Sequence, residues 1–243
     1  MVTTTTDAEL RLLPLLPGTA ASPLRVLEIG DSLGIDLGDQ LQARLDAGGS
    51  ALTTMASVGD SGLSNVTYVN WPAHLASLLA TDRPQIVVVF IGANDDQGID
   101  VNGVASAPGT LAWVAGYAHR VDEMLTEAAG AGARVVWVGM PPMENPDLNI
   151  AVQREDVIYQ RETETFAGTL YVPSAGVLGN TSGLYEATGA DVSGQQVALR
   201  TADGVHLTPA GADALARTVI DAMDHRWRLS VSAPTLYGST ATG

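Results

Sequence analysis

The sequence has neither cysteine nor lysine, and these two absences exclude several kinds of chemistry. Without cysteine there is no disulfide, no thiolate nucleophile, no iron–sulfur cluster and no cysteine-ligated zinc. Without lysine there is no Schiff base, no anchor for pyridoxal phosphate and no P-loop lysine. The 12 basic residues are all arginine, and with 27 acidic residues they give a formal net charge of −15. Because so acidic a chain repels phosphate backbones, we expect no nucleic-acid partner.

Long hydrophobic runs are also missing, and aromatic residues make up only 5% of the chain. The longest apolar stretch, Ile86 to Ala93, is far too short to cross a bilayer, so we expect no membrane span in this chain. The N-terminus has no basic region followed by an apolar run, so we expect no signal peptide. Hydrophobic residues make up 46% of the chain, enough for a core of Ala, Val, Leu and Ile.

Short apolar segments alternate along the chain with segments of helical periodicity. Strands that are apolar throughout predict a parallel sheet covered by helices on both faces. We therefore predict one α/β domain, a three-layer α/β/α sandwich, over residues 23–229, with an N-terminal linker or arm (1–22) and a C-terminal tail (230–243). The predicted strands are 24–29, 51–57, 85–91, 133–139 and 170–172, and the predicted helices are 32–47, 71–80, 110–131, 149–166 and 209–227.

Two serines are candidate nucleophiles, since ligands in such folds sit at the carboxyl ends of strands. Ser32 lies in a Gly-Asp-Ser-Leu-Gly segment that follows the first strand and opens a helix. A serine on a strand-to-helix turn is exposed, and the helix N-terminus offers free N–H groups to an oxyanion. Gly-Asp-Ser recurs at Ser61, but loop-like residues follow it, which favours Ser32. Either segment alone could be a turn with a helix cap.

One of the four histidines stands out as a candidate base. His206 lies in a loop just before the last predicted helix, three residues after Asp203. A carboxylate at that spacing can accept from imidazole Nδ1–H, which fixes the tautomer. No further histidine or carboxylate stands at metal spacing, so we expect no metal site. The other histidines, His74, His119 and His225, fall within predicted helices.

Two more loops at strand ends carry candidate oxyanion donors. Asn94 follows the most apolar strand, and its side-chain amide is a known type of oxyanion donor. The segment Gly59 to Gly62 follows the second strand and can present a backbone N–H. Each signal is weak alone, because turns also use these residues. Their joint occurrence at successive strand ends favours a catalytic site.

These motifs resemble the four blocks of the SGNH hydrolases, also called GDSL esterases. The matching segments are Gly30 to Leu33, the Gly59 to Gly62 glycines, Gly92 to Asp95, and Asp203 to His206, in the family's order. Where the family's second block usually has asparagine, this chain has Ser57. The resemblance covers about residues 24–227 and extends to a bacterial branch with many exported or membrane-anchored members.

The resemblance implies a flavodoxin-like parallel sheet of about five strands and a carboxylic ester hydrolase without a cofactor. It implies Ser32 as nucleophile, His206 as general base and acid, and Asp203 as the orienter of His206. The implied oxyanion hole is formed by the Ser32 N–H, the Asn94 side chain and the Gly62 N–H, with Gly59 as the alternative to Gly62. Acyl transfer would then pass through an acyl-Ser32 intermediate.

The motifs do not decide which substrate is used or whether the acyl group passes to water or to another acceptor. We expect hydrolysis of short-chain, acetyl-type esters, carbohydrate esters among them, since no long apolar lid segment is visible. The same acyl-enzyme could instead transfer its acyl group to a sugar hydroxyl. A third possibility is a non-catalytic glycan-binding module, against which the intact motif residues argue. An α/β-hydrolase is excluded because its nucleophile elbow follows several strands and its acid and histidine are normally far apart in sequence.

The loops at 95–110 and 174–194 are long and rich in glycine, so they could form walls of the site or simple surface excursions. The linker-like N-terminus and the resemblance to exported proteins lead us to expect an extracytoplasmic location. Nothing in the sequence indicates an oligomeric state.

Overall fold

The centre of this computed structural model, which describes residues 15–101 and 103–229, is a five-stranded parallel sheet. The strand order β2-β1-β3-β6-β7 is the flavodoxin-like order, so the predicted fold is confirmed. The strands are β1 (Leu24–Gly30), β2 (Ala51–Met55), β3 (Ile86–Phe90), β6 (Arg134–Val138) and β7 (Thr169–Val172).

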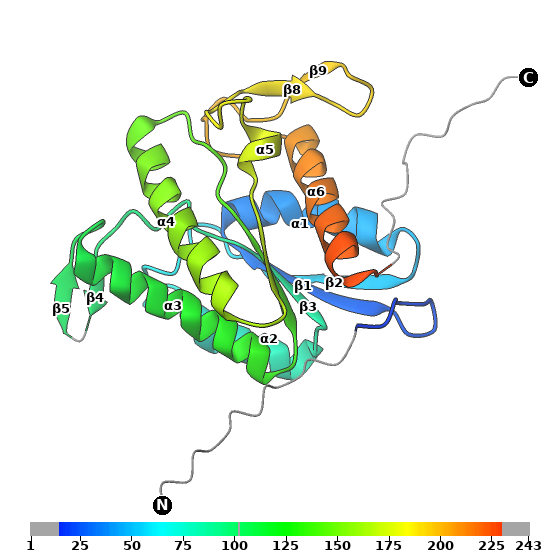
Figure 1. Cartoon of the computed structure of the whole chain (residues 1–243), viewed down its shortest axis with the longest axis horizontal. Helices are drawn as coiled ribbons and strands as arrows, with labels where there is room; N and C mark the ends of the chain where they lie inside the picture. Colours follow the sequence, from blue (N-terminus) through cyan, green and yellow to red (C-terminus); the bar gives the residue numbers. More distant parts are fainter. Residues whose placement is uncertain (1–14, 102, 230–243) are drawn as a thin grey trace, which may run out of the picture.

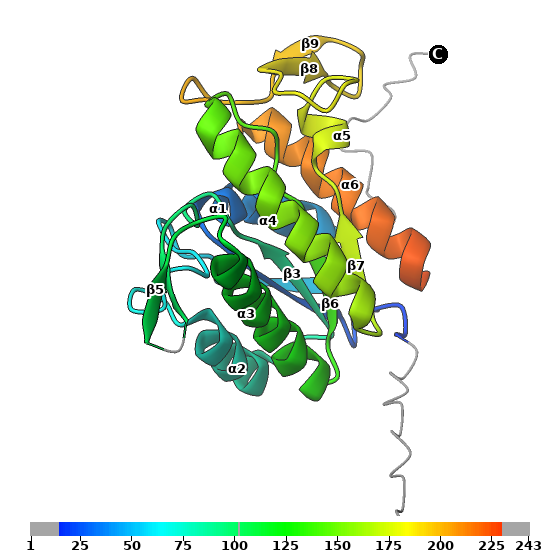
Figure 2. The same ribbon diagram turned by 60° about the vertical axis from the view of Figure 1, so that its left-hand side comes forward.

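Helices cover both faces of this sheet and complete the three layers (Figure 1). On one face α1 (Ser32–Asp46) packs against α6 (Pro209–Trp227). On the other face lie α2 (Trp71–Asp82), α3 (Leu111–Gly130) and α4 (Pro146–Thr165), which stand in front of the sheet in Figure 2. Every residue of β3 and β6 is buried, which explains why these strands are apolar on both sides.

Each long helix begins at a side chain that satisfies free N–H groups of the first turn. Asp31, for example, accepts from Leu33 N at 2.9 Å and starts α1 beside the candidate nucleophile. Pro209 stands in the first turn of α6, where its missing N–H costs no hydrogen bond. The other helix caps are Asn70, Thr110, Asn145 and Thr208.

Three predicted boundaries differ from the structure by two residues or more, and one of them is the end of α2, which lies at Asp82 rather than at 80. Strand β2 ends at Met55 rather than at Ser57, although Ala56 N and Val58 N still donate to β1 carbonyls at 2.9 Å. Helix α4 begins at Pro146 rather than at 149, because Asn145 caps it one turn before its apolar periodicity becomes visible.

The two long loops contain short elements that the sequence did not indicate. The first holds a hairpin of β4 (Ile99–Val101) and β5 (Val104–Ser106). The second holds α5 (Ala175–Leu178) and the start of a hairpin of β8 (Thr188–Ala190) and β9 (Gln196–Ala198). No helix of the described residues is long and apolar enough to cross a membrane. Most of the predicted arm and the predicted tail lie outside the described residues.

A buried carboxyl group, Glu28, interrupts the apolar run of β1. Gly34 and Gly38 let α1 pass over it, since a Cβ at either would lie 2.8 to 3.0 Å from a Glu28 oxygen. Ser57 stands where the family's second block usually has asparagine. Its Oγ donates to Glu28 Oε1 at 2.6 Å, so this serine has a structural role here. Burial raises the pKa of Glu28 to about 8.

We expect this carboxyl group to make the protein less stable as pH rises. Between its ordinary pKa of 4.5 and about 8, the unfolded chain ionises at this position while the folded chain keeps its proton, so the free energy of unfolding falls as pH increases. In Glu28→Gln, urea midpoints measured from pH 5 to pH 8.5 should fall less than in the wild type. The difference should be on the order of a few kcal/mol across this range.

The exposed Glu164→Gln on α4 is the matched control and should reproduce the wild-type slope. Part of the slope should persist in Glu28→Gln, because burial also raises the pKa of Asp31 to about 6 and that of Asp156 to about 7. A Glu28→Gln slope equal to that of the wild type would show that Glu28 is ionised in the folded protein.

Candidate active site

The candidate residues meet at the carboxyl edge of the sheet. Ser32 opens α1 directly after β1, and Asn94 follows β3. His206 lies in the loop before α6, far from both in sequence. Strand β2 supplies the loop that contains Ser61, whose carbonyl accepts from the Asn94 side chain. Parallel strands therefore bring together four segments that the sequence separates.

Ser32, His206 and Asp203 form a continuous chain of hydrogen-bonding groups. His206 Nε2 lies 2.9 Å from Ser32 Oγ, and His206 Nδ1 lies 2.7 Å from Asp203 Oδ2. Ser32 is half-buried, and the side chains of His206 and Asp203 are 38% and 50% exposed, so solvent and a ligand can reach the site. The arrangement lets the imidazole take a proton from the serine while the carboxylate fixes its tautomer.

Asp203 is held as an anion although it is largely exposed. Its Oδ1 atom accepts from Thr201 Oγ1 at 2.6 Å, from Val205 N at 2.8 Å and from His206 N at 3.0 Å. These hydrogen bonds, that of Thr201 foremost, hold the pKa of Asp203 well below its usual range. The carboxylate is thus charged throughout the neutral pH range and can stabilise an imidazolium when one forms.

Asp31, the neighbour of the candidate nucleophile, links two of the site's loops. Besides capping α1, it accepts from Gly92 N and from Ala93 N, both at 2.9 Å, through Oδ2. The carboxylate is fully buried, and burial raises its pKa. Asp31 therefore fixes the turn before Asn94 relative to the start of α1. The sequence predicts only the role of Asp31 as a helix cap. Its contact with Gly92 N could not be predicted, because Gly92 is 61 positions away in the chain.

The Asn94 side-chain amide is anchored by one of its two N–H groups. Its Nδ2 atom donates to Ser61 O at 2.9 Å. Because a side-chain amide has two N–H bonds, one remains for a ligand atom. Ser32 is the first residue of α1, so its backbone N–H also has no partner within the helix. Both donors therefore belong to the segments that surround Ser32 Oγ.

The two glycines that could supply the third donor lie in different surroundings. Gly62 is buried, and a Cβ there would overlap the carboxylate of Asp95. Gly59 is half-buried beside the first turn of α1, where a Cβ would lie 3.9 Å from Ile35 Cδ1. It also follows Val58, whose N–H donates to Gly30 O at the end of β1. These positions favour the Gly59 N–H as the third oxyanion donor, whereas the family resemblance favoured the Gly62 N–H.

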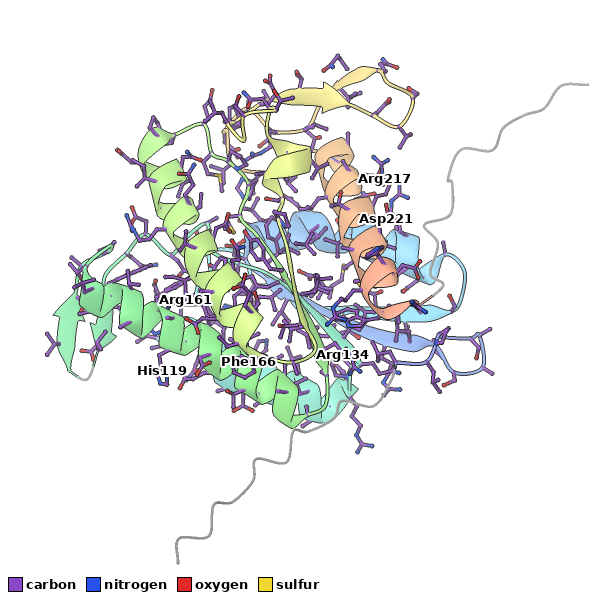
Figure 3. All side chains as sticks on the ribbon, viewed as in Figure 1. His119, Arg134, Arg161, Phe166, Arg217 and Asp221 are labelled. Carbon is purple, nitrogen blue, oxygen red and sulfur yellow. The ribbon has the colours of Figure 1, made fainter. Side chains whose placement is uncertain are left out.

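The hydroxyl of Ser61, the other candidate nucleophile, and the three remaining histidines take no part in the hydrogen-bonded chain from Ser32 to Asp203. Ser61 is fully buried. Its Oγ donates to Gly30 O at 3.4 Å and accepts from Trp71 Nε1 at 3.2 Å. His119 is on the outer side of α3 with a 71% exposed side chain, 3.6 Å from Glu123 (Figure 3). His74 lies in α2 and His225 in the last turn of α6, as predicted.

A polar cluster beneath the site was missed by the sequence analysis. Asp95 is fully buried and accepts from Leu63 N at 2.9 Å and from Ser64 N at 2.7 Å. Arg120 of α3 donates to the carbonyls of the same two residues. The loop after β2 is thus held on both sides, which keeps its Ser61 carbonyl in place for Asn94. No local pattern in the sequence signals this cluster, because Asp95 stands in an ordinary polar run, Asn94 to Gln97, after the apolar strand.

The long loops border the site unequally. The hairpin β4–β5 packs on α3, where a Cβ on Gly116 would meet Val101 and Ile99. The second loop continues through β9 into the Asp203–His206 loop.

Within the described residues, no three His, Asp or Glu side chains cluster in a way that could hold a metal ion.

Comparisons with known proteins identify the family of the chain and its fold. The family described as "Protein of unknown function (DUF459)", an SGNH-like family, matches residues 25–222. None of the curated proteins compared with the chain matches its sequence.

Solved structures share the fold at low sequence identity. A GDSL-like lipase from Bacteroides thetaiotaomicron is 15% identical over 84% of this chain and 89% of its own, with a TM-score of 0.59. The psychrotrophic esterase EstA from Pseudoalteromonas sp., in a structure inhibited by monoethylphosphonate, is 17% identical over 84% of this chain and 99% of its own, with a TM-score of 0.56. The chain belongs to the DUF459 family and has the fold of the SGNH hydrolases.

Proposed function

We propose that the protein is a serine esterase that hydrolyses short-chain carboxylic esters through an acyl-Ser32 intermediate. The observation that carries this proposal is the hydrogen-bonded chain from Ser32 Oγ through His206 to Asp203 at the carboxyl edge of the sheet. The esterases and lipases among the structural neighbours support the general class, ester hydrolysis.

In the proposed reaction each of these groups has its own role. His206 Nε2 takes the proton from Ser32 Oγ as this oxygen attacks the ester carbonyl carbon. The C–O bond to the alcohol breaks as His206 returns the proton to the leaving oxygen. Water, deprotonated by the same nitrogen, then attacks the carbonyl carbon of acyl-Ser32. The bond from this carbon to Ser32 Oγ breaks as His206 returns the proton to Oγ, and the acid is released. Asp203 keeps the imidazole oriented and stabilises its charged form throughout.

The tetrahedral oxyanion in both halves of the reaction is stabilised by three N–H donors. Those we propose are the backbone N–H of Ser32, the free side-chain N–H of Asn94 and the backbone N–H of Gly59. Gly62 was the donor favoured by the sequence analysis, but its buried position against Asp95 makes Gly59 the better candidate.

Removal of the Asn94 amide is expected to lower kcat by about 100- to 1,000-fold with little change in KM. Alanine removes a donor that acts on the oxyanion, while the substrate's ground-state carbonyl uses it less. The check is steady-state hydrolysis of p-nitrophenyl acetate by Asn94→Ala. The matched control is Gln97→Ala, an exposed amide nearby that donates to Asn94 O. A loss confined to KM would assign Asn94 to substrate binding instead.

We expect acetyl esters to be turned over faster than octanoyl esters. The loop after β3 directs Ile99 and Val101 onto α3 rather than forming an apolar cover, so no long acyl chain finds an extended apolar wall there. The check is kcat/KM for p-nitrophenyl acetate, butyrate and octanoate. A higher value for octanoate than for acetate would overturn the short-chain proposal.

The same proposal is tested for carbohydrate esters by incubating the protein with acetylated polysaccharides and measuring free acetate. Adding an acceptor sugar to a donor ester distinguishes hydrolysis from transfer, because mass spectrometry then detects either acetate alone or acetylated sugar. A protein that hydrolyses none of these esters yet binds glycans would be the non-catalytic module considered above.

A further inference from the structure

Arg200 is a buried cation directly behind the Asp203–His206 loop. It is 3% exposed and lies just after β9. It forms no ion pair with any carboxylate of the described residues at 4.0 Å or less, although Arg44, similarly buried, pairs with Asp213. A buried guanidinium is costly unless its N–H groups are satisfied, so its contacts require an explanation.

The guanidinium donates mainly to backbone carbonyls of the loop that it supports. Nη2 contacts Val205 O at 2.7 Å and Gly204 O at 3.3 Å. Nη1 contacts Pro142 O at 2.6 Å, in the segment after β6. Gly204 and Val205 are the only residues between Asp203 and His206, so Arg200 holds the peptide groups that join the two side chains.

Backbone hydrogen bonds within the Asp203–His206 loop also hold its shape. Thr201 N donates to His206 O at 2.9 Å and Gly204 N donates to Thr201 O at 3.1 Å, which closes a tight loop. Gly204 has a φ of +72°, and a Cβ there would collide with Glu144, so the loop depends on glycine at this position. With its carbonyls turned inward to the cation, the loop presents its Asp203 and His206 side chains outward to Ser32.

The outer side of the guanidinium is covered by Tyr185. The Arg200 Cζ atom lies 5.2 Å from the centre of the Tyr185 ring, which is the geometry of a cation–π contact. Tyr185 belongs to the long loop between β7 and β8, so Arg200 connects that loop, the segment after β6 and the Asp203–His206 loop. Arginine suits this role because its planar fork reaches several acceptors at once, which a lysine ammonium cannot do in the same geometry.

We propose that Arg200 is the positioning residue of the Asp203–His206 pair: its guanidinium fixes the loop carbonyls and thereby the distance from His206 Nε2 to Ser32 Oγ. The proposal rests on the esterase function proposed above. Arg200 does not touch the reacting atoms. It acts on turnover by keeping the imidazole in place, and a displacement of about 1 Å at such a group can cost on the order of 100-fold in rate.

The experiment compares Arg200→Lys and Arg200→Met with the matched control Arg44→Met, which removes another buried arginine, one that pairs with Asp213 of α6 instead of donating to the loop carbonyls. Both Arg200 variants are expected to lose about 100-fold in kcat with KM changed less than about twofold. Arg44→Met is expected to lower the urea midpoint while retaining wild-type kcat. In Arg200→Ala, added millimolar guanidinium is expected to restore part of the lost kcat.

A second readout does not depend on turnover. The Nδ1–H proton of His206, bonded to Asp203, should give a downfield NMR signal in the wild type that His206→Gln lacks. This signal should shift or broaden in Arg200→Met and persist in Arg44→Met. A folded Arg200→Met with wild-type kcat and an unchanged signal would overturn the inference. So would equal losses of activity and stability in Arg200→Met and Arg44→Met with no rescue by guanidinium.

The two proposals fail in different ways. If wild-type protein hydrolyses no ester, the proposed function fails, while the NMR signal still reports whether Arg200 holds His206 against Asp203. If the wild type is an active esterase and the Arg200 variants match it, only the positioning role fails.

Discussion

Replacing Ser32 with alanine is expected to abolish ester hydrolysis, by on the order of 10⁶-fold, the scale seen when a serine hydrolase loses its nucleophile. The fold should remain intact, because among the described residues the hydrogen bond of Ser32 Oγ is with His206 alone, and the start of α1 is capped by Asp31. The measurement is the hydrolysis of p-nitrophenyl acetate alongside a circular dichroism spectrum and a thermal melt. Activity near the wild-type level in a folded Ser32→Ala protein would contradict the assignment of Ser32 as nucleophile.

Ser61→Ala is the control, since Ser61 follows the second Gly-Asp-Ser segment. Its Oγ accepts from Trp71 Nε1 within the core, so its loss should lower the melting temperature and leave the chemistry of Ser32 in place. If Ser32→Ala retained activity and Ser61→Ala lost it in a folded protein, the nucleophile would be Ser61.

Asp203→Asn is expected to lower kcat by about 10⁴-fold, the effect of the same change in another serine hydrolase's triad. An amide in place of the carboxylate can neither accept from His206 Nδ1–H in the same way nor compensate an imidazolium. The chain geometry should survive, because an asparagine oxygen can still accept from Thr201 and from the Val205 N–H. Steady-state kinetics from pH 5 to pH 9 measure this loss.

Asp36→Asn is the matched control for this change. Asp36 lies beside the same loop and accepts from Leu207 N at 2.9 Å, a contact that an asparagine oxygen can also make. Its kcat should stay within a few-fold of the wild type. Equal losses in the two variants would mean that negative charge near His206 matters rather than the direct contact of Asp203 with Nδ1.

The fold was predictable where apolar periodicity is strong. The runs that became β3 and β6 are apolar, apart from Arg134 at the start of β6, because both faces of these strands are buried. The short hairpins gave no such signal, since strands of three residues are too brief for a period to appear. The start of α4 was displaced because Asn145 and Pro146, both typical of a helix start, come before the first buried residue of that helix, Ala151.

The candidate site was predictable as far as its residues follow strands or precede a helix. Ser32, Asn94 and the Asp203–His206 pair have that local context, and the structure brings them together. The supporting groups have no local signal. Arg200 is one of the 12 arginines in the chain, and only its burial and the carbonyls around it distinguish it.

The choice between the two glycines illustrates the same limit. In sequence Gly59 and Gly62 stand in one short segment and differ little. In space Asp95, a residue after the next strand along the chain, covers Gly62 and leaves Gly59 beside α1. Tertiary contacts that join residues tens of positions apart decide such questions, and local patterns do not contain them.

The central claim is that Ser32 is an activated nucleophile, and covalent labelling tests it most directly. Wild-type protein treated with a fluorophosphonate and digested should carry one phosphonyl adduct, located by mass spectrometry on the peptide containing Ser32. Labelling should slow strongly in His206→Gln, which keeps the serine but loses the base. No adduct on the wild type, an adduct at Ser61, or equal labelling rates in the two proteins would contradict the account.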